Sequence, residues 1–149
     1  MRADEEDAAA AVDAVVAALR DHGCTDVTVV ARNAEAGSAL AGLYGFRYAT
    51  EAPGGARVLV NATPVGMSGG PAAQDLSFPA ELIAAADTVA DVVAMPPETP
   101  LIRAGRAAGT TVITGAEVIA LQAAEQFVLY TGVRPDAALV RAASEYSRS

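Results

Sequence analysis

Short β-branched runs alternate with alanine-rich stretches along the whole chain. Compact apolar runs occur at four places, residues 27–31, 57–60, 88–93 and 111–114. Between them, apolar side chains recur at the three- and four-residue steps of one helix face, beginning with Val12, Val15, Val16 and Leu19. Strands that alternate with helices are typical of βα units around a parallel sheet. The pattern therefore predicts an α/β protein.

Capping residues set the expected helix boundaries. Asn33, Thr99 and Thr114 each precede a helical stretch, Pro100 suits a first turn, and Glu117 stands at capping-box spacing from Thr114. The predicted helices are Ala8–Arg20, Ala34–Leu43, Pro79–Ala85, Pro100–Ala108, Ala116–Thr131 and Asp136–Tyr146. With a short extended piece at Phe46–Ala49, the expected order is α-β-α-β-β-α-β-α-β-α-α.

This order favours a Rossmann-like parallel sheet with helices on both faces. A dinucleotide-binding fold begins with a strand and a glycine-rich turn, whereas this order begins with a helix. The opening residues, MRADEED, contain no glycine, and their charge would repel a pyrophosphate. We therefore expect a single domain over residues 1–149 that lacks the first strand and the glycine-rich loop. In the usual strand order that strand is central, so its neighbours are expected to have unpaired edges.

Composition narrows the class of partner. Of 149 residues, 52% are hydrophobic and 19% charged, which fits one folded domain. The net charge of −8 argues against nucleic acid. No apolar run approaches the roughly 20 residues needed to cross a membrane, and MRADEED lacks the apolar core of a secretory signal. Cys24 stands alone, so no internal disulfide forms and a cytoplasmic location is expected. All 10 basic residues are arginine, which excludes chemistry by a lysine amine.

Two strand ends could bind a ligand. Arg32 and Asn33 follow the run at 27–31, where an arginine could grip a phosphate or simply be solvated beside a helix cap. On those residues alone, the solvated arginine is the favoured interpretation. The segment Asn61–Met67 follows another strand, and its Thr63 could line a nucleotide cleft or belong to an ordinary turn.

Four further residues, Gln122, Gly115, His22 and Cys24, have both a functional and a structural interpretation. Gln122 lies within an apolar helix and would face either solvent or a site, and solvent is the commoner case. Gly115, before that helix, could admit a flat ring or serve as a turn glycine. His22 and Cys24 are the only histidine and the only cysteine in the sequence, which is too few ligands for a zinc site. We therefore expect a structural role for both and no metal site.

Taken together, these segments resemble the carboxyl-terminal, NADP-binding domain of the shikimate and quinate dehydrogenases. The resemblance extends from about Ala8 to the end of the chain. The matching blocks are VNATPVGM at 60–67, DVV at 91–93 with TPL at 99–101, and GAEVIALQAA at 115–124 with Phe127 and GVRP at 132–135.

The resemblance implies reversible reduction of 3-dehydroshikimate by NADPH, within aromatic amino-acid biosynthesis by the chorismate pathway. It implies that Arg32 and Asn33 contact the adenosine 2′-phosphate. It places residues Asn61, Thr63, Val92 and Gly115 along the cofactor. Gln122 would bind the hydroxylated ring of a shikimate- or quinate-type substrate, which reverses the solvent-facing interpretation of that residue.

Three departures from the family pattern change these expectations. Ala94 stands where the family usually has a tyrosine that touches the substrate. Residues 34–36, Ala-Glu-Ala, lack a second basic residue for the phosphate, so NAD is an expected alternative to NADP. The family's amino-terminal substrate domain, with its catalytic Lys-Asp pair, is expected to be absent. We therefore assign no catalytic residue here, and expect a homodimer or a complementing chain, with a non-catalytic nucleotide-binding or interaction module as the alternative.

Overall fold

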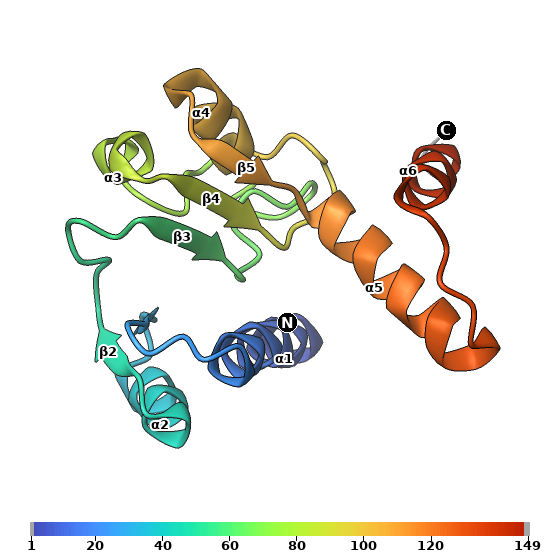
Figure 1. The fold of residues 1–149 in the computed structure, drawn as a ribbon. Helices are drawn as coiled ribbons and strands as arrows, with labels where there is room; N and C mark the ends of the chain where they lie inside the picture. Colours follow the sequence, from blue (N-terminus) through green and yellow to red (C-terminus); the bar gives the residue numbers. More distant parts are fainter. Residues whose placement is uncertain (1, 148–149) are drawn as a thin grey trace.

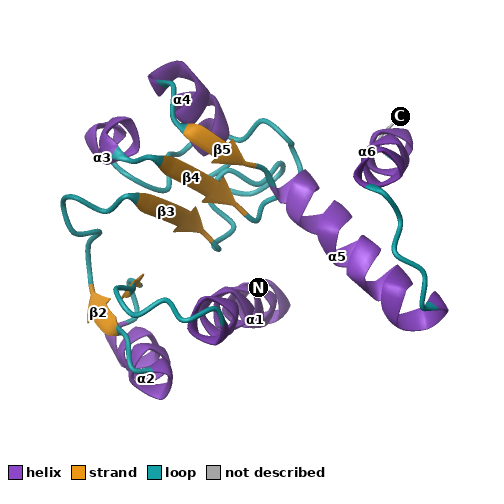
Figure 2. Ribbon diagram, viewed as in Figure 1, coloured by secondary structure: helices purple, strands orange, loops and turns teal. Residues whose placement is uncertain are grey.

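The computed structural model describes residues 2–147, with side chains from residue 10 onward. Figure 1 shows the fold, and Figure 2 separates its helices and strands. The elements are α1 (Arg2–Asp21), β1 (Thr28–Val30), α2 (Ala34–Tyr44), β2 (Arg47–Ala49), β3 (Val58–Asn61), α3 (Ala80–Ala85), β4 (Thr88–Asp91), α4 (Pro100–Ala108), β5 (Thr111–Ile113), α5 (Gly115–Thr131) and α6 (Ala137–Tyr146). The predicted order of helices and strands is confirmed.

The predicted caps are formed by the expected side chains. Asn33 accepts a hydrogen bond from the Ala36 amide at 3.1 Å, and Thr99 caps α4 in the same way. Thr114 and Glu117 form the predicted capping box at the start of α5. The other predicted helix boundaries agree to within one residue, but α1 begins at Arg2 rather than Ala8. Acidic residues at positions 4–7 suit the first turns of a helix, where the helix dipole favours negative charge.

The strands are parallel, as predicted, but they form two sheets instead of one. β1 pairs with β2, and separately β3 pairs with β4 and β4 with β5. No strand in residues 2–147 lies between β1 and β3 to join the two sheets. Each of those strands therefore keeps one edge of backbone hydrogen-bonding groups without a strand partner. The break agrees with the expected absence of a first strand, because that strand would be central and its neighbours are left with unpaired edges.

The three-stranded sheet packs its main core against α3 and α4. That core consists of Leu59, Ile83, Ala86, Val89 and Leu101. Strand residues alternate between the two faces of a sheet, and Val58 and Ile113, on the other face, are 57% and 40% exposed. Helices therefore cover one face of this sheet well and leave the other largely open, which corrects the expectation of cover on both faces.

A second, smaller core joins α1 and α2 to the two-stranded sheet. Val16, Val29 and Ala41 form its buried centre. Helix α2 approaches this sheet closely, since a β-carbon added to Gly37 would lie 2.6 Å from the ring of Tyr48. The smaller core is built from neighbouring segments of the chain and shares none of its buried residues with the main core.

Helix α5 leaves the main core after its first turn. Gly115 and Ala116 are buried, whereas Leu129 and Tyr130 near the other end are 83% and 86% exposed. In Figure 1, α5 extends away from the three-stranded sheet, and the chain then turns back so that α6 lies beside α5. Ile119, Leu121 and Phe127 are also about half exposed or more, so α5 presents an unusual amount of apolar surface. Within residues 2–147, no helix is long and apolar enough to span a membrane.

Candidate nucleotide-binding edge

The carboxyl ends of β3 and β4 bring two polar side chains together. Asn61 ends β3 and Asp91 ends β4, and the two residues are register partners in the parallel ladder. Asn61 is 2% exposed, and its Nδ2 donates a hydrogen bond to Asp91 Oδ1 at 3.0 Å. Open α/β sheets bind their ligands at this end of the strands. The pair therefore lies where a nucleotide site is expected.

Asn61 also organises the turn that follows β3. Its Oδ1 accepts hydrogen bonds from the Thr63 amide at 3.1 Å and from Thr63 Oγ1 at 2.7 Å. Its Nδ2 donates a second hydrogen bond, to the Val65 carbonyl at 3.1 Å. Thr63 is exposed while Asn61 is buried. The buried Asn61 side chain therefore holds the turn in place, and the exposed Thr63 side of the turn can contact a ligand.

Asp91 is a fully buried carboxylate with hydrogen bonds from three segments. Thr99 Oγ1 donates to its Oδ2 at 2.6 Å, and the Val93 amide donates to its Oδ1 at 3.0 Å, beside the bond from Asn61. Burial raises the pKa of Asp91, and the hydrogen bonds from Thr99, Val93 and Asn61 oppose that rise. No ion pair to Asp91 is formed within residues 10–147.

Val92 and Gly115 meet at the same edge. The Val92 amide donates to the Asn61 carbonyl at 3.0 Å, which joins the backbone after β4 to the end of β3. A β-carbon added to Gly115 would lie 2.7 Å from the Val92 carbonyl oxygen. Four of the predicted cofactor residues, Asn61, Thr63, Val92 and Gly115, are thus assembled at one edge. Gly115 allows the start of α5 to approach the backbone after β4.

Arg32 and Asn33 lie apart from this cluster, at the carboxyl end of β1. Arg32 is exposed, and no hydrogen bond or ion pair engages its side chain in the described part of the chain. The cap of α2 occupies Asn33 Oδ1, and Asn33 Nδ2 has no acceptor among the described residues, so it can donate to a ligand. This pair suits an anion by charge and donor type.

Gln122 lies on the exposed part of α5, seven residues after Gly115. A helix rises about 1.5 Å per residue, so the two residues are separated by about 10 Å along the axis. Gln122 has no described contact with the cluster around Asn61.

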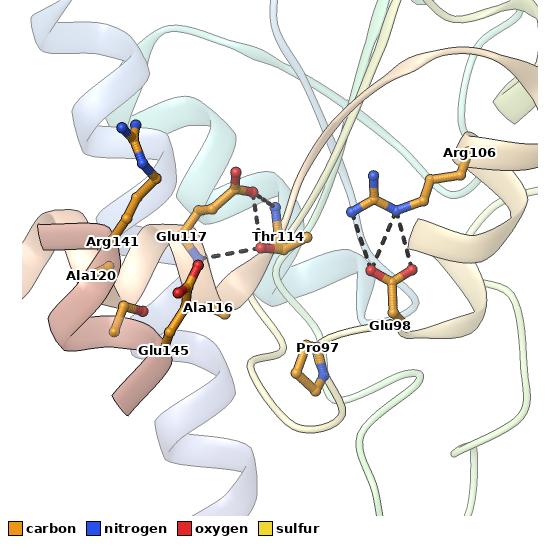
Figure 3. A pocket seen from close by; sticks show the side chains of 10 residues that line it. Pro97, Glu98, Arg106, Thr114, Ala116, Glu117, Ala120, Arg141 and Glu145 are labelled. Atoms are coloured by element: carbon orange, nitrogen blue, oxygen red, sulfur yellow. Dashed lines mark hydrogen bonds and ion pairs between the residues drawn. The ribbon is translucent and has the colours of Figure 1, made fainter. Parts of the chain in front are cut away.

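Two hollows lie beside the edge, around the first turns of α5. The larger, of about 290 Å³, is lined by Glu98, Glu117, Glu145, Arg106 and Arg141 among others. Figure 3 shows Glu98 paired with Arg106, and the capping box of Thr114 and Glu117 on the opposite wall. Acidic side chains outnumber the arginines here, so this hollow suits an anionic dinucleotide poorly.

The smaller hollow, of about 200 Å³, is mainly apolar. It is lined by Ala94, Met95, Ala116, Ile119, Ser144 and Ser147. Ala94, which stands in place of the expected tyrosine, therefore borders this hollow. Its walls favour an apolar rather than a charged part of a ligand.

Asp91 and Thr99 were missed as site residues by the sequence interpretation. Both are 0% exposed, although aspartate and threonine are mostly surface residues. The available signal was the position of Asp91 directly at the end of a strand, level with Asn61 at the end of the neighbouring strand. Among the described side chains, no three or more His, Cys, Asp or Glu residues cluster in a way that could hold a metal.

The parallel strands and their polar carboxyl edge define an α/β domain of the Rossmann type. The chain is 46% identical over 137 residues to a shikimate dehydrogenase-like protein of Haemophilus influenzae, covering 91% of this chain and 51% of that protein. Shikimate 5-dehydrogenase of Thermus thermophilus, solved with NADP(H) and shikimate, matches with a TM-score of 0.74 and 34% identity over 89% of this chain and 50% of that one.

A third similar structure is quinate dehydrogenase of Corynebacterium glutamicum in complex with NAD. It matches with a TM-score of 0.73 and 33% identity, over 91% of this chain and 51% of that one. No family model matches the chain. The chain is a homologue of the shikimate dehydrogenase family, and it spans about half the length of the relatives that it matches.

Proposed function

We propose that this chain is the nicotinamide-dinucleotide-binding half of a shikimate dehydrogenase-like oxidoreductase. The observation that carries the proposal is the cluster of Asn61, Thr63, Val92 and Gly115 at the carboxyl edge of β3 and β4. Relatives of known structure hold NADP(H) or NAD. A bound nicotinamide supplies or accepts the hydride in this chemistry. The residues of this chain bind and orient it.

The two ends of the cofactor would meet two different parts of the chain. Arg32, exposed and unpaired in the described part of the chain, would hold the adenosine 2′-phosphate, with Asn33 Nδ2 as a second donor. Thr63 would meet the nicotinamide ribose, and Val92 and Gly115 would border the nicotinamide ring. NADP is the proposed cofactor because of Arg32. NAD is the alternative, because Glu35 in the first turn of α2 would oppose a 2′-phosphate.

The proposed substrate is 3-dehydroshikimate or a related hydroxylated cyclic acid, bound in part by Gln122. The Thermus thermophilus relative was solved with shikimate. The apolar hollow beside Ala94 supports a related acid over shikimate itself, because the expected phenol would hydrogen-bond a hydroxyl and alanine would not.

The chain by itself is proposed to be inactive. It contains no lysine, and the only histidine, His22, hydrogen-bonds the Ala18 carbonyl near the end of α1. A non-catalytic nucleotide-binding or interaction module is the second candidate. The observation that favours it is an accessible surface of 9616 Å², where a compact monomer of 15.0 kDa exposes about 7,000 Å². That excess also supports association, with a second copy of the chain or with a complementing chain.

The melting temperature of the chain with and without nucleotide tests the proposal. NADPH at saturating concentration should raise it, since a ligand that binds the folded state stabilises it by mass action. No rise with either NADPH or NADH would sink nucleotide binding. NADP+-dependent oxidation of shikimate should be absent from the isolated chain, and turnover would overturn the proposed inactivity. Sedimentation of a monomer at all concentrations would contradict self-association.

A further inference from the structure

We infer that Asp91 is a positioning residue for the cofactor, acting through Asn61 and Thr63. This inference rests on the proposed function. Asp91 is fully buried and does not meet the ligand itself. Its carboxylate fixes the direction in which the Asn61 amide is turned, and that direction fixes the exposed Thr63 turn.

The first step concerns hydrogen-bond polarity. An ionised carboxylate only accepts hydrogen bonds, whereas a carboxamide has one accepting and one donating end. Because Asp91 Oδ1 faces Asn61 at 3.0 Å, Asn61 must present its NH₂ group there. Asn61 Oδ1 is then turned toward Thr63, where it accepts from both the amide and the hydroxyl. A reversed Asn61 would set its NH₂ against the Thr63 amide, donor against donor.

The second step concerns Thr63 itself. Its hydroxyl proton is committed to Asn61 Oδ1 at 2.7 Å, and its Oγ1 accepts from the Val65 amide at 3.3 Å. The hydroxyl therefore has one direction left, as an acceptor on the exposed side of the turn. A donor on the ligand, such as a ribose hydroxyl, matches that acceptor. The hydrogen bond from Asn61 to Asp91 and the one from Thr63 to Asn61 thus determine how the exposed Thr63 hydroxyl is oriented.

The third step concerns the other ligands of the same carboxylate. Asp91 Oδ1 also holds the Val93 amide, which follows the Val92 position beside Gly115. Its Oδ2 holds Thr99, the cap of α4, on the side away from Asn61. Oδ1 of Asp91 therefore joins the turn after β3 to the backbone after β4, whereas Oδ2 of the same carboxylate anchors α4. Because different oxygens make these contacts, the two effects can be tested independently.

Three variants of the full chain separate positioning from stability. Asp91→Leu removes every acceptor, and Asp91→Asn keeps an oxygen for Asn61 and Val93. Thr99→Val removes the donor to Oδ2 and the cap of α4, and leaves both bonds to Oδ1 in place. The measurements are the NADP+ dissociation constant by calorimetry, the melting temperature, and exchange of the Thr63 amide hydrogen by NMR.

Asp91→Leu should weaken NADP+ binding by about tenfold and speed exchange of the Thr63 amide hydrogen, because Asn61 and the Val93 amide lose their buried acceptor.

The controls give the opposite pattern. Thr99→Val should lower the melting temperature yet change NADP+ affinity by less than about twofold, and Asp91→Asn should restore affinity to within about threefold of the unaltered chain. Equal losses of affinity in Asp91→Leu and Thr99→Val, or no rescue by Asp91→Asn, would overturn the inference. If the unaltered chain binds neither NADP+ nor NAD+, the proposed function fails and the role toward the cofactor with it. In that case unchanged Thr63 exchange in Asp91→Asn and faster exchange in Asp91→Leu would still support the hold on the turn, and any other exchange pattern would overturn it.

Discussion

A β-carbon added to Gly115 would lie 2.4 Å from the carbonyl oxygen of Val93. Real β-carbons do not approach backbone that closely, so Gly115→Ala must displace either α5 or the backbone after β4. We expect the free energy of unfolding to fall by about 1–3 kcal/mol, as in other overpacked sites. Urea unfolding followed by circular dichroism measures this. NADP+ affinity should fall as well, because the displaced backbone belongs to the proposed nicotinamide site.

Gly42 provides the matched control for that substitution. It lies on the exposed side of α2, and a β-carbon there would meet no atom within 4 Å. Gly42→Ala should stabilise the chain by about 0.5–1 kcal/mol, since glycine is less favourable than alanine within a helix. If both alanine variants behave alike, the close approach at Gly115 does not constrain the fold.

Arg32→Ala should weaken NADPH more than NADH. The guanidinium is proposed to hold the 2′-phosphate, which only NADPH carries, and such a charge-assisted contact contributes about 1.5–3 kcal/mol. Fluorescence titration with each cofactor gives the two dissociation constants. Arg57→Ala is the control, because Arg57 carries the same charge at the amino end of β3 and is paired with Asp87. Equal losses for the two cofactors would refute the phosphate role.

The pH dependence of stability should differ between the unaltered chain and Asp91→Asn. Burial raises the pKa of Asp91 in the folded state above its unfolded value near 3.8. Its contribution to stability is therefore fully present below that unfolded value and is lost as the pH rises through the raised folded pKa. Asparagine does not titrate, so the variant should gain stability relative to the unaltered chain as the pH rises from the unfolded value of Asp91 through its raised folded value. Urea unfolding of both proteins at each pH measures the difference. A constant difference would show that the carboxyl group is not desolvated.

Gln122→Ala should leave cofactor binding and stability nearly unchanged. Gln122 is exposed on α5 and has no described partner in the Asn61 cluster, and surface substitutions of this kind usually change stability by less than about 0.5 kcal/mol. The expected loss is in substrate binding. With NADP+ present, shikimate should shift the Gln122 side-chain amide signals in NMR spectra of the unaltered chain. Weaker NADP+ binding by the variant would instead place Gln122 at the cofactor.

Local chemistry made the helices predictable. Asn33, Thr99 and the pair Thr114–Glu117 begin their helices where the sequence expected, because each cap involves residues only three apart. The break between β1 and β3 followed instead from the usual strand order of a Rossmann-type sheet, because the first strand, which was expected to be absent, is central in that order.

The sequence predicted the part of the candidate site that lies within one turn and missed the part that depends on strand pairing. Asn61 and Thr63 belong to one turn, which the sequence made visible as a polar segment after an apolar strand. Asp91 is recognised only when β3 and β4 are laid side by side, because its partner Asn61 is 30 residues away in sequence. A carboxylate of that kind looks like a surface residue until the register is known.

The division of the core also sets how the molecule loses its structure. The smaller core and the side chains packed on it come from residues 12–48, and the main core from residues 56–112, with the exposed Pro53–Gly55 segment between them. Contiguous units that share few contacts open separately in native-state hydrogen exchange. Protection should therefore fall into two classes along the sequence. Limited proteolysis would cut first between them, within residues 50–57, releasing two pieces that each retain their own buried cluster for a time.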